Sequence, residues 1–165
     1  NPDLVTSFTY EPNFNQIKTI QDPRGNITTY TYDYELGEPS KGNLRKITFP
    51  QVNSQTIESS FTYTSFGQLE TVTDPNGNTT RYEYFPLTGY LKKLTQGLNT
   101  PDSSAAEFTY DPIGNVSSVK DPRGYTTTFQ YDVNNNLKQI ARYCRRKLKG
   151  ALFLTLPCLW LAHFG

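Results

Sequence analysis

The chain has 165 residues, of which 35% are hydrophobic and 14% aromatic, with twelve Tyr and ten Phe. The hydrophobic share lies below the roughly 45–50% that is usual for globular domains, so aromatic rings supply much of the apolar surface. Residues 1–140 contain no Cys, His or Trp, which excludes disulfides, Cys or His metal sites and His-dependent nucleophilic triads from this part of the chain.

The formal net charge is +1, but the charges are unevenly distributed. Residues 141–165 carry five basic and no acidic side chains, which leaves eleven basic against fifteen acidic residues, a net charge of −4, in residues 1–140. An acidic body repels phosphate, so we expect no nucleic-acid partner. The chain opens on Asn1 and contains no Met, so we expect it to be an internal piece of a longer protein.

The first predicted element is a strand around Phe8 and Tyr10, whose spacing by two places both rings on one face. A turn-prone stretch follows, and then Ile17 and Ile20, which are spaced by three. The same unit recurs along the chain. The aromatic pairs are Phe8/Tyr10, Tyr30/Tyr32, Phe61/Tyr63, Tyr82/Tyr84, Phe108/Tyr110 and Phe129/Tyr131, and the aliphatic pairs are Ile17/Ile20, Leu44/Ile47, Leu69/Val72, Leu91/Leu94, Val116/Val119 and Leu137/Ile140. We therefore predict six hairpins in tandem.

Short and long links alternate between these units. The short links contain the turns Asp22-Pro23-Arg24-Gly25, Asp74-Pro75-Asn76-Gly77 and Asp121-Pro122-Arg123-Gly124. In such a turn the Asp accepts backbone hydrogen bonds, the Pro fixes φ and the Gly supplies a positive φ. We therefore predict structural roles, and no catalytic or ligand role, for Asp22, Asp74, Asp121, Gly25, Gly77 and Gly124.

The aliphatic pairs are the one place where the period is ambiguous, because a spacing of three suits a helix better than a flat strand. The Gly and Asn residues on either side leave no room for ten helical residues. We predict a short strand in each case, with a bulge or a change of face that absorbs the odd residue.

The last predicted element is a tail, residues 141–165, whose composition differs from the repeats. Its apolar stretch from Ala151 to Gly165 contains Pro157 and is shorter than the span of about 20 residues that crosses a membrane. We expect no membrane span. Three explanations remain open: a shifted reading frame, truncation or fusion; the start of a variable domain; and an interfacial anchor.

These features predict an all-β fold of tandem antiparallel β-hairpins. Residues 1–140 hold the six hairpin repeats, and residues 141–165 form the non-repeat tail. One hairpin alone cannot bury enough apolar surface to be stable, so we expect stability to belong to the array.

The unit from Phe108 to Asp132 resembles the YD repeat of the Rhs family, which is shared with the C component of insecticidal Tc toxins and with teneurins. The Tyr-Asp pair itself occurs at Tyr32-Asp33, Tyr110-Asp111 and Tyr131-Asp132, and it drifts to Tyr10-Glu11, Tyr63-Thr64 and Tyr84-Phe85. The resemblance implies that the hairpins form a curved or spiralling sheet. It also implies that this sheet is a segment of a β-shell, which encloses a C-terminal polymorphic toxin of an exported protein, secreted or held at the cell surface. Its implied partners are neighbouring repeats of the parent chain and the enclosed toxin.

The resemblance also implies what this segment lacks. The toxin-releasing cleavage motif of the family has Leu after Asp-Pro-x-Gly, where this chain has Asn26, Asn78 and Tyr125. We therefore predict no autoproteolysis, and no catalytic, cofactor-binding or metal-binding residue.

The six second-position tyrosines are interpreted as structural residues that pack on a shared sheet face; they are Tyr10, Tyr32, Tyr63, Tyr84, Tyr110 and Tyr131. Aromatic rings also stack on sugars. The alternative function is therefore a cell-surface adhesion or carbohydrate-binding module, in which the aromatic rings of the same hairpins bind surface glycans.

Overall fold

A computed structural model describes residues 4–38, 41–146, 154–157 and 162–163 of the chain. The chain divides into two compact units, Asn1–Arg81 and Tyr82–Gly165. The boundary falls inside one strand, β7 (Thr79–Tyr84), so each unit holds part of it.

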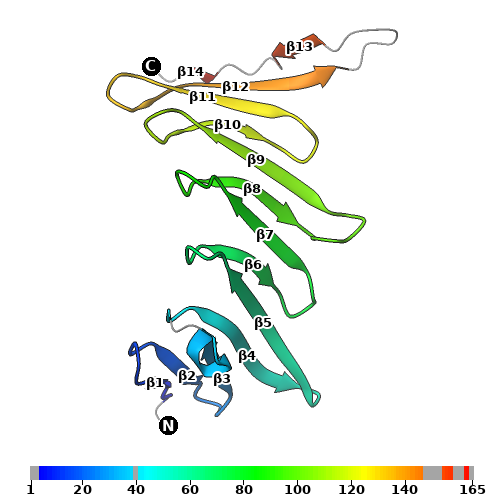
Figure 1. Cartoon of the computed structure of the whole chain (residues 1–165). Helices are drawn as coiled ribbons and strands as arrows, with labels where there is room; N and C mark the ends of the chain where they lie inside the picture. The colour runs from blue at the N-terminus through cyan, green and yellow to red at the C-terminus, as the bar shows by residue number, and fades with distance from the viewer. Residues whose placement is uncertain (1–3, 39–40, 147–153, 158–161, 164–165) are drawn as a thin grey trace. The chain divides into compact units, whose positions relative to one another are not determined.

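The first unit is an antiparallel meander in which each strand pairs with the next one along the chain (Figure 1). Its elements are β1 (Ser7–Tyr10), β2 (Ile17–Gln21), β3 (Ile27–Tyr32), the 3₁₀ helix η1 (Asp33–Leu36), β4 (Leu44–Val52), β5 (Gln55–Tyr63) and β6 (Leu69–Thr73). The last pairing within this unit joins β6 to the start of β7, with Thr73 opposite Thr79.

The second unit continues in the same way from the end of β7. Its strands are β8 (Leu91–Gln96), β9 (Ser104–Tyr110), β10 (Val116–Lys120), β11 (Thr126–Tyr131), β12 (Leu137–Arg146), β13 (Leu154–Pro157) and β14 (Ala162–His163). Both β13 and β14 pair with β12. The predicted all-β fold of tandem antiparallel hairpins is thus confirmed, and β12 runs on past residue 140 into the segment assigned to the tail.

The aromatic strands β1, β3, β5, β9 and β11 each pair with the aliphatic strand that follows across a β-bulge, as predicted. Opposite Thr9 and Tyr10 stand Thr19 and Ile17, so that Lys18 is the extra residue. The same shift occurs at the second-position tyrosines Tyr32, Tyr63, Tyr110 and Tyr131. Each bulge leaves one residue out of the ladder. The two aliphatic residues that are spaced by three in the sequence therefore lie on the same face of the sheet.

The register places the apolar residues in rows across each unit. In the first unit Phe8 lies opposite Ile20, and Ile20 lies opposite Thr28. The pattern of aromatic, aliphatic and small residue repeats as Tyr30, Ile47 and Ser59, as Phe61, Val72 and Thr80, and in the second unit as Phe108, Val119 and Thr127. Side chains of directly opposed residues lie on the same face, so each row is a shared apolar stripe.

The other face of the sheet is polar. Thr9, Thr19, Thr29 and Thr48 stand opposite one another in successive strands, and the row ends at Glu58. The Thr9 and Thr19 hydroxyls share a hydrogen bond of 2.6 Å. Hydroxyl pairs and opposite charges across strands stabilise this face at little cost in desolvation.

Burial is shallow throughout the described residues. The buried set there consists of Tyr32, Glu11 and Asp33, with 5%, 3% and 2% of their surface exposed. Most strand side chains are half-buried. The side chains of the apolar rows are therefore partly covered by neighbouring side chains of the same sheet. The described residues form no second layer over them.

The 3₁₀ helix η1 was not expected from the sequence. Eleven residues separate Tyr32 from Leu44, whereas five separate Tyr110 from Val116. The longer connection forms one helical turn that ends at Gly37, whose φ of 76° lies in the left-handed region. Glycine adopts that φ without the steric cost that a Cβ brings.

Candidate functional site

Four of the repeat tyrosines reach across to the preceding hairpin with their hydroxyl groups. Each hydroxyl donates to the carbonyl oxygen of the first aliphatic residue of that hairpin. The pairs are Tyr32 to Ile17 at 2.6 Å, Tyr63 to Leu44 at 2.9 Å, Tyr110 to Leu91 at 3.0 Å and Tyr131 to Val116 at 3.0 Å. We call these contacts the tyrosine clamps.

The clamps stand where the backbone pairing between hairpins stops. Between β2 and β3 the last pair at this end is Thr19 with Thr29, and the Ile17 carbonyl lies two residues beyond it. Because the bulge after Ile17 diverts β2, backbone bonds do not reach this carbonyl from β3, and the Tyr32 hydroxyl satisfies it instead. A half-buried carbonyl left without a donor costs about 1–3 kcal/mol.

Burial favours the protonated form of several repeat tyrosines. It raises the pKa of Tyr32, Tyr63, Tyr84 and Tyr110 above the ordinary value of 10.0. Tyr10 differs in being 57% exposed, because it stands on the first strand of the unit. The clamp hydroxyls of Tyr32, Tyr63 and Tyr110 are therefore hydrogen-bond donors at any physiological pH.

Several turns at both ends of the strands are capped by an acidic side chain. In the turn that begins at Asp74, one carboxylate oxygen accepts the backbone N–H groups of Asn76 and Asn78, each at 2.9 Å. The other oxygen accepts the Asn78 side-chain amide at 2.9 Å. The same backbone caps occur at Asp22, Asp111, Asp121 and Asp132.

Sequence reasoning identified Asp22, Asp74 and Asp121 but missed Asp111 and Asp132. Asp111 and Asp132 belong to Tyr-Asp pairs, and they cap the turns at the other end of the strands. The signal was present, because both kinds of turn share an Asp followed four residues later by an Asn or, once, Tyr125. The aspartates of the two motifs therefore have the same role, which is to accept backbone N–H groups of their own turn.

The capping hydrogen bonds lower the pKa of most of these aspartates. At Asp22 and Asp74 the leading cause is the side-chain amide of the following Asn26 or Asn78. Burial raises the pKa of Asp111, but the bonds from Asn115 and Ile113 outweigh it, so the net shift is downward. The carboxylates of Asp22, Asp74 and Asp111 thus stay ionised further into acidic solution than an ordinary aspartate.

These shifts predict acid sensitivity. A carboxyl whose pKa is lower in the folded chain binds fewer protons there than in the unfolded chain, so it stabilises the fold above its ordinary value of 3.8 and loses that contribution as the pH falls. We expect the urea midpoint of the 165-residue chain to fall steadily between about pH 5 and pH 2. The Asp74→Asn variant keeps an acceptor oxygen but has no proton to gain, so its midpoint should fall less. A midpoint that is equal or higher at pH 3 than at pH 7 contradicts the capping role.

A second prediction concerns the fourth turn residue, which has a positive φ. Gly77 and Gly124 both have φ of 83°, and Asn135 occupies the matching position of the Asp132 turn with φ of 69°. We expect Gly124→Ala to destabilise the chain by about 1–2 kcal/mol, because a Cβ disfavours this conformation. Since Asn tolerates it, Gly124→Asn should cost clearly less. Chemical denaturation of both variants tests the order, and an equal loss would rule out the backbone as the cause.

Two buried carboxylates in the first unit form a separate cluster that the sequence did not reveal. The Glu11 carboxylate accepts the backbone N–H groups of Asn13, Phe14 and Gln16 at 2.7–2.9 Å. The Asp33 carboxylate accepts those of Tyr34, Lys41, Gly42 and Asn43 at 2.8–3.2 Å. Burial raises the pKa of each carboxyl, but these bonds outweigh it and the net pKa is lowered.

Aromatic rings and one ion pair complete this cluster. The Tyr32 and Tyr34 rings stack with centroids 6.1 Å apart, and Phe14 lies 5.9 Å from Tyr34. Glu35 accepts the Tyr32 backbone N–H at 2.9 Å and pairs with Lys18, the bulged residue of β2. The first two hairpins are thereby joined by polar as well as apolar contacts.

Chemically, these groups are already engaged with the chain itself. Among the described residues, no group of three or more His, Cys, Asp or Glu side chains is placed to hold a metal ion. Within the described part of the chain, no helix has the length and apolar character to cross a bilayer. The arrangement stabilises turns and joins hairpins.

Comparison with known proteins gives a consistent result. A model of the RHS repeat family matches residues 63–103 and 110–142. The fold is similar to the crystal structure of TcdB2–TccC3–Cdc42, with a TM-score of 0.68, 22% identity and coverage of 84% of this chain and 7% of that one. It also resembles a structure of the Photorhabdus luminescens Tc holotoxin pore, with a TM-score of 0.60, 20% identity and coverage of 84% and 9%. The chain thus spans less than a tenth of these structures. No curated protein sequence matches it.

Proposed function

Because this chain is a segment of an Rhs repeat array, we propose that it forms part of the wall of a β-shell that encloses a C-terminal toxin domain in a longer exported protein. The chain itself contributes structure, and its partners are neighbouring repeats and the enclosed domain. The similarity to Tc toxin structures supports the fold of this wall. The enclosed domain and the export are inferences from the family resemblance.

The tyrosine clamps are the observation that carries this proposal. Each clamp fastens one hairpin to the one before it, and the contact is nearly the same at Tyr63, Tyr110 and Tyr131. A join that repeats with the unit can be continued for any number of hairpins. This property suits a wall that is built from many equivalent units.

A carbohydrate platform is less well supported on the aromatic face. The hydroxyls of Tyr32, Tyr63 and Tyr110 are already donated to backbone carbonyls. Few polar groups remain there to orient a sugar. A glycan array probed with the 165-residue chain tests this alternative, and selective binding lost in Tyr-to-Ala variants would favour it over the wall.

The wall proposal is tested on the complete protein that contains this chain. We expect its reading frame to encode many further Tyr-Asp units around this segment. In the intact protein, proteinase K should leave the C-terminal domain whole, and Tyr110→Ala should make it digestible by opening the wall. Phe66→Ala, at a side chain that is 84% exposed, is the matched control and should change nothing. If the C-terminal domain of the unaltered protein is digested as quickly as that of the Tyr110→Ala variant, the enclosure is refuted.

A further inference from the structure

One hairpin of the second unit departs from the rule that its turn begins with a capping oxygen. Its counterparts have Glu11, Asp33, Thr64, Asp111 and Asp132 at this position, and each accepts a hydrogen bond from the backbone of its own turn. The β7–β8 turn has Phe85 instead, and is closed by the Phe85 N–H to the Tyr90 carbonyl at 2.9 Å. A local rule broken in this way is expected where a surface serves contact with another molecule.

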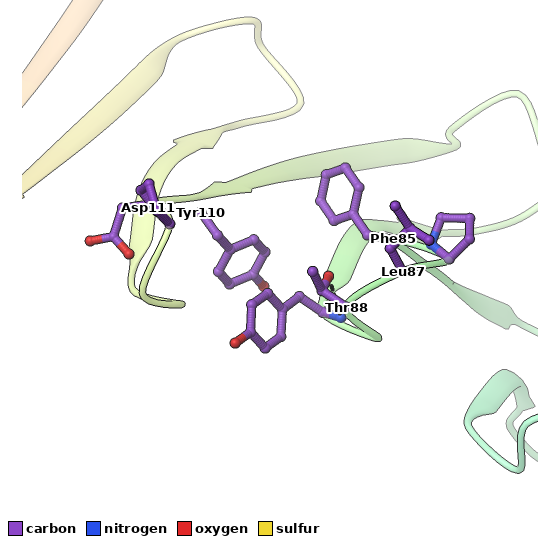
Figure 2. Close-up of a pocket in the computed structure, with 8 residues that line it drawn as sticks. Phe85, Leu87, Thr88, Tyr110 and Asp111 are labelled. Atoms are coloured by element: carbon purple, nitrogen blue, oxygen red, sulfur yellow. Dashed lines mark hydrogen bonds between the residues drawn. The ribbon is translucent and has the colours of Figure 1, made fainter.

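The departure creates an apolar pocket of about 390 Å³ between two neighbouring turns (Figure 2). Phe85, Pro86, Leu87, Thr88 and Tyr90 line it from the β7–β8 turn, and three residues line it from the β9–β10 turn: Tyr110, Asp111 and Pro112. Both turns belong to the second unit.

The walls of the pocket are held in place by the fold. The Tyr90 and Tyr110 ring centroids are 4.8 Å apart, and Phe85 stands nearly perpendicular to Tyr110 at 6.3 Å. The Tyr110 ring is fixed by its clamp to Leu91. Gly114 makes room for Tyr90, because a Cβ there would lie 2.5 Å from the Tyr90 hydroxyl.

The polar side chains of the lining are largely occupied. The Tyr110 hydroxyl donates to Leu91, and the Thr88 hydroxyl oxygen accepts the Tyr90 N–H at 3.3 Å. The Asp111 carboxylate accepts two backbone N–H groups and one side-chain amide within its own turn. A sugar needs several free hydrogen-bonding partners to replace its hydration, and this pocket offers few. An apolar ring, in contrast, binds through contact with apolar surface and needs no hydrogen-bonding partner from the pocket.

We propose that this pocket binds an extended, proline-containing segment of another polypeptide. Aromatic-lined grooves bind polyproline II segments through flat ring faces, and such segments keep their backbone solvated and need few side-chain hydrogen bonds. The lining supplies three aromatic rings and two prolines. The Asp111 carboxylate at the end away from Phe85 is the one charged group of the lining, so a basic residue beside the prolines complements it (Figure 2).

The rim of the pocket is open to solvent, as such an occupant requires. Leu87 is 100% exposed and Tyr90 is 40% exposed. A ligand that lies across the two turns would therefore cover side chains that nothing in the described chain covers. This proposal is independent of the wall, since a pocket at the turns neither needs nor prevents enclosure of a toxin.

The test uses the 165-residue chain and a fluorescein-labelled decapeptide that contains two Pro-x-x-Pro motifs and one Arg, with fluorescence anisotropy as the readout. The same peptide with its prolines replaced by alanine is the reference. We expect the proline peptide to bind at least about tenfold more tightly. Leu87→Ala should weaken that binding several-fold without affecting the fold, because the Leu87 side chain makes no buried contact. Phe66→Ala, at an exposed residue of the β5–β6 turn, should have no effect.

Three outcomes overturn the proposal. The first is equal affinity for the two peptides, and the second is unchanged binding to Leu87→Ala. The third is tighter binding of a labelled cellohexaose than of the proline peptide, with loss of that binding in Tyr90→Ala, which would assign the pocket to sugars. Circular dichroism of each variant shows that the strands are retained.

Discussion

Replacing Tyr32 with Ala is expected to lower the free energy of unfolding of the first unit by about 3–5 kcal/mol. Tyr32 is the one aromatic ring among the described residues that is buried, at 5% exposed. Its truncation removes the stack on Tyr34, leaves a cavity beside it and removes the donor for the Ile17 carbonyl. Chemical denaturation followed by circular dichroism measures the loss.

Two variants separate the ring from its hydroxyl. Tyr32→Phe keeps the ring and removes only the donor, so it should cost about 1 kcal/mol. Tyr10→Ala removes the same residue type from the same repeat position, where the side chain is 57% exposed, and should cost less than either. If Tyr10→Ala and Tyr32→Ala are equally destabilising, the clamp and the buried ring do not have the role assigned to them.

The second large effect is expected at Asp33. Its carboxylate accepts four backbone N–H groups and is 2% exposed. Asp33→Ala leaves several buried donors without an acceptor, each worth about 1–3 kcal/mol, so we expect a loss of at least about 3 kcal/mol. The same denaturation experiment reports it.

Asp22→Ala is the matched control for Asp33→Ala. Asp22 also caps a turn, but that turn is exposed and water replaces the lost acceptor. Its loss of stability should be clearly smaller than that of Asp33→Ala. Equal losses would mean that burial of the carboxylate is not what makes Asp33 important.

The hairpins were predictable because their signal is local. The aromatic spacing of two sets the face of each strand, and the Asp-Pro-x-Gly turns set where the chain reverses, as at Asp74 to Gly77. The bulge also followed from the residues, since a spacing of three on a strand needs one residue outside the ladder. Local propensity and the global fold agree at these positions.

The contacts between hairpins were not predictable from one sequence. Tyr110 donates to Leu91, nineteen residues away, and Tyr131 donates to Val116, fifteen residues away. The partner depends on where the backbone ladder ends, which only the three-dimensional register shows. The Glu11 and Asp33 caps were missed for a similar reason, because an acidic residue after Tyr indicates a turn but not its burial.

Exceptions to the repeat carried information that the repeat itself does not. The drift from Tyr-Asp to Tyr84-Phe85 was visible in the sequence, but the pocket that Phe85 forms with Tyr90 and Tyr110 requires two turns to lie side by side. The helix η1 likewise fills a connection whose extra length was visible and whose conformation was not.

The central claim is that rings spaced by two form one apolar face shared by neighbouring hairpins. The most direct test is solution NMR of the 165-residue chain. We predict nuclear Overhauser contacts from the Phe108 ring to the Val119 methyls, and from these to the Thr127 methyl, because the three residues stand opposite one another on successive strands. Medium-range contacts typical of helix in these segments, or Phe108 without any contact to Val119, would contradict the claim.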